Sequence, residues 1–125
     1  MRAVVEMPKG TKYKYEMKEI FGVKKLILDR VLNQAVPANY GYIPNTTAPD
    51  GDAEDIFIIS DEPLVAGCEV EVEILGKFIC IDNGVQDDKL VGYIFGEEEP
   101  RDLSKIRHYL STYKSGFLVG NWEEV

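Results

Sequence analysis

Apolar and polar residues alternate in several short segments of the chain, which predicts a protein built mainly from β-strands. The clearest alternation runs through residues 13–17, where Tyr13, Tyr15 and Met17 share one face and Lys14 and Glu16 share the other. Further segments rich in β-branched and aromatic residues have the length and composition of strands, at 26–28, 56–59, 70–74 and 90–94. Turn-forming residues separate them, at 8–10, 49–52, 66–67 and 82–84.

One later segment repeats its apolar residues at helical spacing, namely Leu103, Ile106, Leu110 and Tyr113. Asp102 is placed to cap the start of this helix, and Gly116 follows as a stop signal. Many short strands with one helix near the end predict a mainly β fold with a flanking helix (α+β), a small closed or partly closed β-barrel. No repeat, low-complexity tract or long linker divides the chain, so residues 1–125 are expected to form a single domain.

The charge of the chain is unevenly distributed. The formal net charge is −8, yet residues 1–30 hold eight Lys and Arg against four Asp and Glu. Residues 31–49 carry no charge, and residues 50–125 hold six bases against eighteen acids. Because such an acidic chain repels a nucleic-acid backbone, broad electrostatic binding to DNA or RNA is disfavoured. Dense carboxylates with a few bases suit a polyanion that arrives with divalent cations.

Several features indicate a cytoplasmic protein. No apolar run reaches the roughly 18 residues that a membrane helix needs, so no membrane span is expected. The acidic residue Glu6 interrupts the N-terminal segment early, whereas a signal peptide has a longer apolar stretch. Cys68 and Cys80 lie in apolar, strand-like runs without metal-ligand spacing, which favours buried, reduced thiols over a disulfide.

The strongest local signal for chemistry is the acidic run at 50–55. Asp50, Asp52 and Asp55 converge only if the backbone turns tightly there, and carboxylates are the usual protein ligands of Mg²⁺. An isolated run of this kind is also common in solvated turns. A calcium-binding EF-hand loop is disfavoured, because its sixth position needs glycine where Asp55 stands and its twelfth needs glutamate where Asp61 stands.

A second acidic turn, at 82–89, lies between two predicted strands. Alone it reads as a polar hairpin connection, but beside the first turn it could complete a site for more than one metal ion. Single bases among apolar or aromatic neighbours could bind phosphate if they converge from separate elements, namely Lys14, Arg30, Lys89 and Lys114. His108, on the predicted helix, reads as structural or interfacial, and the acidic run at 97–99 as a solvated loop.

These motifs, taken in order, resemble the soluble inorganic pyrophosphatases of the first, magnesium-dependent family. The matching segments extend over nearly the whole chain, at 4–8, 14–16, 28–30, 37–46, 50–55, 82–89 and 113–114. The aspartate run and the Asn-Tyr-Gly-Tyr-Ile-Pro stretch at 39–44 are specific in combination. The resemblance implies a five-stranded OB-type β-barrel in a compact version, with flanking helical structure, and a homo-oligomer.

The resemblance also implies an activity and a site. The activity is Mg²⁺-dependent hydrolysis of inorganic pyrophosphate to two orthophosphates by in-line attack of a metal-bound water, with several Mg²⁺ ions and Mn²⁺ or another divalent ion as a substitute. The implied metal ligands are Glu6, Glu16, Asp50, Asp55, Asp82 and Asp87. The implied catalytic residues are Asp52, as the base that orients and deprotonates the water, with Arg30 and Tyr40. The implied substrate-binding residues are Lys14, Arg30, Tyr40, Lys89, Tyr113 and Lys114.

The sequence departs from the family pattern near these residues. Ala53 and Glu54 stand where a proline and an apolar residue are usual, and Asn83 and Gln86 replace glutamates beside the second acidic turn. Asn121 stands where a lysine is common. The chain also lacks most of the terminal segments and the long loop that often form subunit contacts. None of the implied site residues is substituted, which favours an active enzyme over a structural descendant.

Two other functions remain open from the residues. An OB-type module that binds single-stranded nucleic acid or oligosaccharide without catalysis has the same strand-rich pattern, although it needs a basic groove with stacking aromatics. A phosphohydrolase that acts on nucleotides or polyphosphate needs a stacking platform for a base, and none is evident in the sequence.

Overall fold

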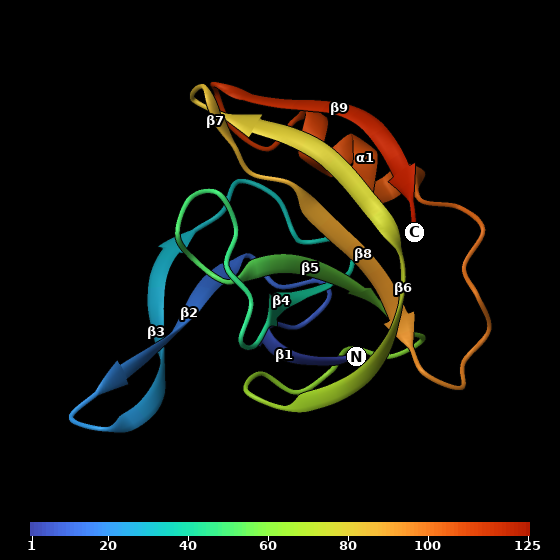
Figure 1. Cartoon of the computed structure of the whole chain (residues 1–125). Coiled ribbons are helices and arrows are strands. Elements are labelled where there is room, and N and C mark those ends of the chain that lie inside the picture. The colour runs from blue at the N-terminus through green and yellow to red at the C-terminus, as the bar shows by residue number, and fades with distance from the viewer.

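The computed structural model describes residues 1–125, and most of the chain lies in β-strands (Figure 1). The strands are β1 (Arg2–Met7), β2 (Tyr13–Ile20), β3 (Val23–Val31), β4 (Asn39–Ile43), β5 (Glu54–Ile59), β6 (Glu69–Asp82), β7 (Val85–Gln86), β8 (Lys89–Ile94) and β9 (Phe117–Glu124). The single helix α1 (Ser104–Ser111) precedes β9. This helix has neither the length nor the apolar character needed to cross a membrane.

Five strands pair into a closed ring, in the order β1-β4-β5-β8-β6, with β6 pairing back to β1. All neighbours are antiparallel except β5 and β8, which run parallel. This order and the one parallel pair are the topology of an OB-type barrel, which confirms the predicted fold. Strand β9 pairs with the outer part of β6 and, with α1, lies at one end of the ring (Figure 1).

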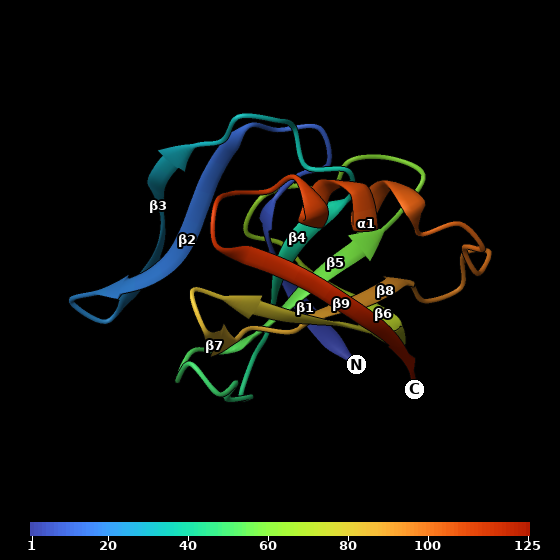
Figure 2. The ribbon, with the colours of Figure 1, turned by 90° about the horizontal axis from the view of Figure 1, so that it is seen from above.

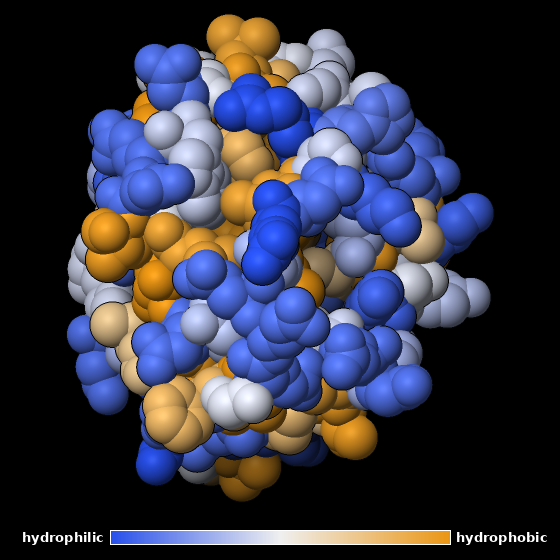
Figure 3. Space-filling view, turned by 90° about the vertical axis from the view of Figure 1, so that its right-hand side faces the viewer, coloured by the Kyte–Doolittle hydropathy of each residue, from blue (hydrophilic) through white to orange (hydrophobic).

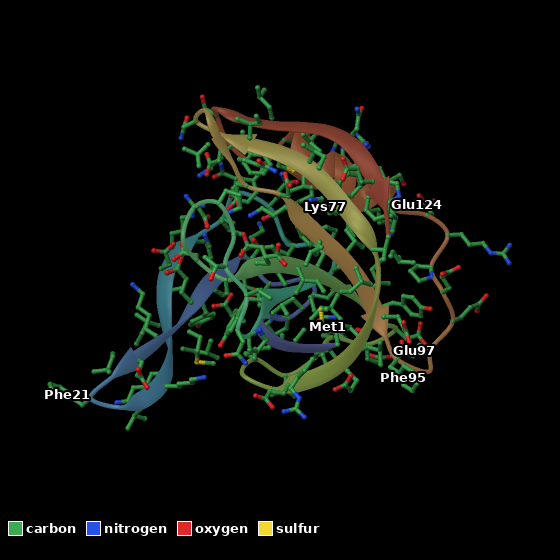
Figure 4. The ribbon with its side chains drawn as sticks, viewed as in Figure 1. Met1, Phe21, Lys77, Phe95, Glu97 and Glu124 are labelled. Atoms are coloured by element: carbon green, nitrogen blue, oxygen red, sulfur yellow. The ribbon has the colours of Figure 1, made fainter.

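The β2–β3 hairpin forms a separate two-stranded sheet that projects away from the ring (Figures 1 and 2). Its turn is built on Phe21 and Gly22, both with positive φ, as a tight two-residue hairpin requires. Phe21 is fully exposed at the tip and points away from the rest of the molecule (Figure 4). Because the hairpin leaves the ring, it can form one wall of a cleft beside it.

Two apolar clusters stabilise the fold. The smaller lies inside the ring, as a small barrel requires, with Leu90 and Ile94 of β8 partly buried against it. Its buried members come from β1, β4, β5 and β6, namely Ala3, Val5, Ile43, Ile56, Ile58 and Val72. The larger packs α1 and β9 against the ring, with Phe57, Phe78, Leu110 and Phe117 among its members. On the side turned away from the hairpin, hydrophilic side chains cover most of the surface and apolar patches lie between them (Figure 3).

The predicted strands are all present, but several boundaries were wrong. Strands β1, β4, β7 and β9 were not recognised, and the segment predicted at 70–74 belongs to a longer strand, β6. The helix begins at Ser104 and takes Leu103 as its N-cap, while the predicted cap Asp102 accepts the Ser104 N–H at 2.9 Å through its side chain. The helix ends at Ser111, so Tyr113 lies beyond it. Both cysteines are free, with Cys80 buried and Cys68 partly buried.

Candidate active site

One cavity of about 500 Å³ lies between the β2–β3 hairpin and the ring. Every residue that the sequence singled out for the site lines this cavity: Glu6, Lys14, Glu16, Arg30, Tyr40, Asp50, Asp52, Asp55, Asp82, Asp87, Lys89, Tyr113 and Lys114. They come from seven strands and three connecting segments, so only the folded chain brings them together. Their individual roles remain predictions.

Lys89 is the buried centre of this arrangement, and its side chain is 8% exposed. The parallel pairing of β5 and β8 sets Lys89 beside Asp55. The ammonium nitrogen lies 2.6 Å from Asp55 Oδ2 and 3.2 Å from Asp87 Oδ2, and it donates to the Tyr40 hydroxyl at 3.0 Å. With three acceptors, the three N–H groups of the ammonium are satisfied, so the buried charge is paired rather than isolated.

Burial shifts the pKa values in this cluster. Burial disfavours the charged form of Lys89, but Tyr40, Asp55 and Asp87 outweigh it and hold the Lys89 pKa well above its usual value. Burial raises the pKa of Asp87 above its usual range, although the charge of Lys89 opposes that shift. The pKa of Tyr40 also rises well above its usual value because the hydroxyl is buried. Tyr40 is therefore a neutral hydroxyl that can both accept and donate.

The hairpin contributes the second group of bases. Lys14 and Arg30 lie opposite each other in the β2–β3 register, so both side chains emerge from the same face. The Arg30 guanidinium donates to the Tyr113 hydroxyl at 2.8 Å and lies 5.7 Å from the centre of that ring. This contact links the hairpin to the segment that follows α1. Lys14 lies 3.8 Å from Glu16 and 3.9 Å from Asp29, which are loose pairs that leave its charge available to a ligand.

The loop between β4 and β5 carries the first acidic turn on the rim of the cavity. The Gly51 N–H donates to the Ala48 carbonyl at 2.9 Å, with proline at the second position of the turn. Asp50 Oδ1 accepts the N–H of Asp52 at 3.0 Å, a local bond that fixes the Asp50 carboxylate. The Asp52 carboxylate is exposed and has neither a hydrogen bond nor an ion pair with another residue. It is thus a free acceptor at the cavity rim.

The second acidic turn lies opposite and carries paired carboxylates. Lys114 Nζ lies 3.0 Å from Asp82 Oδ2, which ties the end of β6 to the segment between α1 and β9. The turn itself places Asn83 and Gly84 at positive φ, as the Asn-Gly sequence predicts.

Glu6 is a half-buried acid at the base of the cavity. Its Oε2 accepts the N–H of Met17 at 2.7 Å, so it joins β1 to the hairpin. Burial raises the Glu6 pKa to about 7; the Met17 hydrogen bond opposes this shift, and the charges of Asp55 and Glu16 add to it. The carboxyl group therefore gains or loses its proton near neutral pH.

The donor chemistry around the cavity fits a hard divalent cation. Eight carboxylates and neither a cysteine nor a histidine line it, and such ions take oxygen ligands. No three acidic side chains are close enough together to hold an ion between them, because Lys89 lies between Asp55 and Asp87 and Lys114 pairs with Asp82. A cation bound by these residues would compete with the two lysines for the same oxygens.

Sequence reasoning missed some of the cavity lining. Tyr42 lies two residues after Tyr40 on the same face of β4 and opposite Asp55 on β5. Its place follows from period-two alternation, a signal that was available had β4 been recognised as a strand. Phe117 also lines the cavity, and its ring centre lies 5.9 Å from Lys89 Nζ. Nothing in its sequence context marks it, because it reaches the site only through the pairing of β9 with β6.

Comparison with known proteins agrees with this arrangement. The family model described as inorganic pyrophosphatase matches residues 3–124 of the chain. The chain belongs to the inorganic pyrophosphatase family. Among its curated relatives, the inorganic pyrophosphatase of Halalkalibacterium halodurans is 38% identical, over 100% of this chain and 82% of the relative. The soluble inorganic pyrophosphatase of Oryza sativa subsp. indica is 36% identical over 89% of this chain, which spans only 57% of that protein's length.

Solved structures of the family share the fold. The inorganic pyrophosphatase of Thermus thermophilus superposes with a TM-score of 0.86 at 32% identity, covering 99% of this chain and 82% of the other. The Helicobacter pylori inorganic pyrophosphatase gives a TM-score of 0.85 at 30% identity, covering 99% of this chain and 84% of the other. The OB-type ring with its projecting hairpin is therefore the shared architecture of this chain and these pyrophosphatases.

Proposed function

We propose that this chain hydrolyses inorganic pyrophosphate to two orthophosphates in the presence of Mg²⁺. The observation that carries the proposal is the single cavity that all of the residues expected for this chemistry line together. Family membership supports the same reaction. A cavity that combines carboxylates with lysines, an arginine and tyrosines matches a small polyanion that enters with cations, rather than a long basic groove for nucleic acid.

The side chains that line the cavity have three proposed roles, and the first is to bind phosphate. Arg30, Lys14 and Lys114 are basic groups that can bind phosphate oxygens, Arg30 through two N–H groups and the lysines as point charges. The Tyr40 and Tyr113 hydroxyls are neutral groups that can also donate hydrogen bonds to phosphate oxygens. These positive and polar groups stabilise the negative charge that develops on the leaving phosphate.

Asp52 is the group that we assign to the attacking water. Its carboxylate is exposed at the cavity rim and has no protein partner, so it is free to orient a water molecule and accept its proton. Asp50, by contrast, uses one oxygen to accept the Asp52 N–H, which holds the turn in shape.

The carboxylates are the groups that would hold Mg²⁺, namely Glu6, Glu16, Asp50, Asp55, Asp82 and Asp87. Bound cations would neutralise charge on pyrophosphate and favour deprotonation of water near Asp52. Lys89 pairs with Asp55 and Asp87, so it orients both carboxylates toward the cavity. Mn²⁺ or another hard divalent ion would suit the same oxygens.

Phosphate release from pyrophosphate, with and without Mg²⁺, tests this function. We expect turnover that chelation abolishes and Mg²⁺ restores, with pyrophosphate preferred over ATP and tripolyphosphate at equal concentration. A preference for ATP would instead assign the chain to nucleotide hydrolysis. Tight, salt-sensitive binding of short oligonucleotides without turnover would favour the OB-type binding module.

Three further expectations accompany this function. We propose that residues 1–125 form one domain, which unfolding in a single cooperative transition would support. We propose a homo-oligomer, to be measured by light scattering on the eluted protein. We propose a cytoplasmic location, which two free cysteines favour and which fractionation of the source cells would test.

A further inference from the structure

The pairing of β6 with the returning chain is interrupted beside the site. Ile81 pairs with Gln86 in β7, and Phe78 pairs with Lys89 in β8. Asp87 and Asp88, which lie between Gln86 and Lys89, belong to neither strand. The Asp87 N–H still donates to the Cys80 carbonyl at 2.9 Å. The reciprocal bond is different, because the Cys80 N–H donates to the Asp88 side chain, at 3.0 Å from Oδ1. A carboxylate thus takes the place of a main-chain acceptor.

Two other groups hold the same carboxylate. Gln86 Nε2 donates to Asp88 Oδ2 at 2.7 Å, and Lys77 Nζ lies 3.3 Å from that oxygen. Lys77 lies on β6 (Figure 4), so Asp88 is tied to its partner strand both through the main chain at Cys80 and through a side chain. The Asp88 side chain is only 13% exposed, and it is held from three directions.

The side chains of Asp87, Asp88 and Lys89 alternate in direction, so the contacts of Asp88 bear on both of its neighbours. Asp87 and Lys89 line the cavity, whereas Asp88 between them does not. In extended chain, neighbouring side chains point to opposite sides, so fixing Asp88 outward turns Asp87 and Lys89 inward. Cys80 is fully buried, and its N–H would lose its acceptor if Asp88 were truncated. A buried N–H without an acceptor is unfavourable, so the local backbone would move to satisfy it.

We propose that Asp88 is a positioning residue of the site: its carboxylate replaces the missing main-chain acceptor for Cys80 and thereby holds Asp87 and Lys89 toward the cavity. It does not touch the substrate and acts through its two neighbours. The role of those neighbours rests on the proposed function, so the test includes measurements that do not depend on turnover.

The test compares Asp88→Ala with Asp88→Asn and with Val72→Ala. Asp88→Ala removes the acceptor, whereas Asp88→Asn keeps an oxygen for the Cys80 N–H and loses the charge beside Lys77. Val72 is buried in the barrel cluster away from the cavity, so Val72→Ala controls for a general loss of stability. The readouts are Mg²⁺ binding by calorimetry without substrate, amide hydrogen exchange at Cys80, and kcat and KM for pyrophosphate.

We expect Asp88→Ala to weaken Mg²⁺ binding by about tenfold, as loss of a group that orients a metal ligand commonly does, and to lower kcat more than it changes KM. Exchange at the Cys80 amide should become faster. Asp88→Asn should lie closer to the wild type than to Asp88→Ala in every readout, and Val72→Ala should lower the melting temperature without changing Mg²⁺ binding.

Unchanged Mg²⁺ binding in a folded Asp88→Ala protein would overturn the proposal, as would an equal loss of binding in Val72→Ala. If Asp88→Ala does not fold, Asp88→Glu keeps the charge but displaces the carboxylate from the Cys80 N–H by one methylene; weaker Mg²⁺ binding then supports the assignment and unchanged binding overturns it. A wild type that binds Mg²⁺ but does not hydrolyse pyrophosphate would refute the proposed function alone, because the binding and exchange readouts still report on Asp88.

Discussion

The two acidic turns that border the cavity look alike in sequence but differ in structure. In the first, between β4 and β5, Asp50 and Asp52 are exposed, and the only carboxylate bond is the local one from the Asp52 N–H to Asp50. In the second, between β6 and β8, Asp87 and Asp88 are mostly buried, and both pair with a lysine. One turn keeps its carboxylates free, and the other builds them into the fold.

The two turns show that an acidic residue in a site can be either a free carboxylate or a buried, paired one. A free carboxylate at the rim costs little stability and keeps its lone pairs for a ligand or a proton. A buried carboxylate needs a partner, because an unpaired buried charge is strongly unfavourable. Substitutions in the first turn should therefore affect activity, whereas substitutions in the second should affect activity and folding together.

The largest expected effect is on turnover, in the first turn. We expect Asp52→Asn to lower kcat about 100- to 10,000-fold, the usual contribution of a general base, because the amide cannot accept the proton of water. Stability should change by less than about 0.5 kcal/mol, since the side chain is exposed and unpaired. Steady-state kinetics and urea unfolding measure the two effects. Asp61→Asn, at an exposed acid outside the cavity, serves as the control, and a similar loss of kcat there would count against a specific role for Asp52.

The largest expected effect on stability belongs to the second turn. Lys89→Met leaves the Asp55 and Asp87 carboxylates without their buried cation, which costs about 3 kcal/mol when one partner of a buried pair is removed. Because burial already raises the Asp87 pKa and Lys89 opposes that shift, the variant should raise this pKa further. Protonation then relieves part of the loss, so urea unfolding should show a smaller difference from the wild type at pH 4 than at pH 7.

Lys105→Met is the matched control, since Lys105 is exposed on α1 and makes no ion pair. It should unfold as the wild type does at both pH values. If Lys89→Met were equally stable, the second turn would be no more a part of the fold than the first, and the contrast between the turns would fail.

The sequence predicted the composition of the site better than it predicted the strands that carry it. The site residues are chemically distinctive and their order along the chain resembles a known family. Strand β4 was missed because the buried residues that alternate with Tyr40 and Tyr42 include Asn39 and Gly41, which do not look like core positions. Asn39 is buried because its amide satisfies four partners, and Gly41 because a Cβ there would overlap the Val4 carbonyl.

The pairing of charges could not be predicted at all from the sequence. That Lys89 neutralises Asp55 depends on the parallel register of β5 and β8, which are separated by the whole of β6 in the chain. The turn of the projecting hairpin was also hidden, because Phe21 occupies a positive-φ position where asparagine or glycine is usual. Long-range register and unusual backbone conformations follow from the assembled fold rather than from local patterns.

A smaller effect should appear at Glu6, which lies between the two kinds of carboxylate. Its pKa is raised from 4.5 to about 7, so above pH 4.5 the unfolded chain ionises while the folded protein keeps the proton. The wild type should therefore lose stability as the pH rises from about 4.5 through 7, and Glu6→Gln should lack this loss. The full shift would correspond to about 3 kcal/mol, and solvent access to the half-buried group reduces the expected difference to about 1 kcal/mol.

Urea unfolding of both proteins across this pH range, in EDTA so that no cation competes for the carboxylate, measures the difference. Glu19→Gln, an exposed acid on the hairpin, is the control and should follow the wild type. Parallel stability curves for the wild type and Glu6→Gln would show that Glu6 behaves like the free carboxylates of the first turn.

The smallest expected effect concerns the stiffness of the first turn. Ala53 has no main-chain hydrogen bond from its N–H, so Ala53→Pro removes no bond and reduces the freedom of the unfolded chain. We expect a gain of about 0.5 kcal/mol in urea unfolding and little change in KM. Pro49→Ala, which removes the existing proline of the same loop, should shift stability in the opposite direction. If Ala53→Pro instead lowers kcat with stability unchanged, the free carboxylate of Asp52 needs a mobile loop, and the first turn would differ from the second in motion as well as in burial.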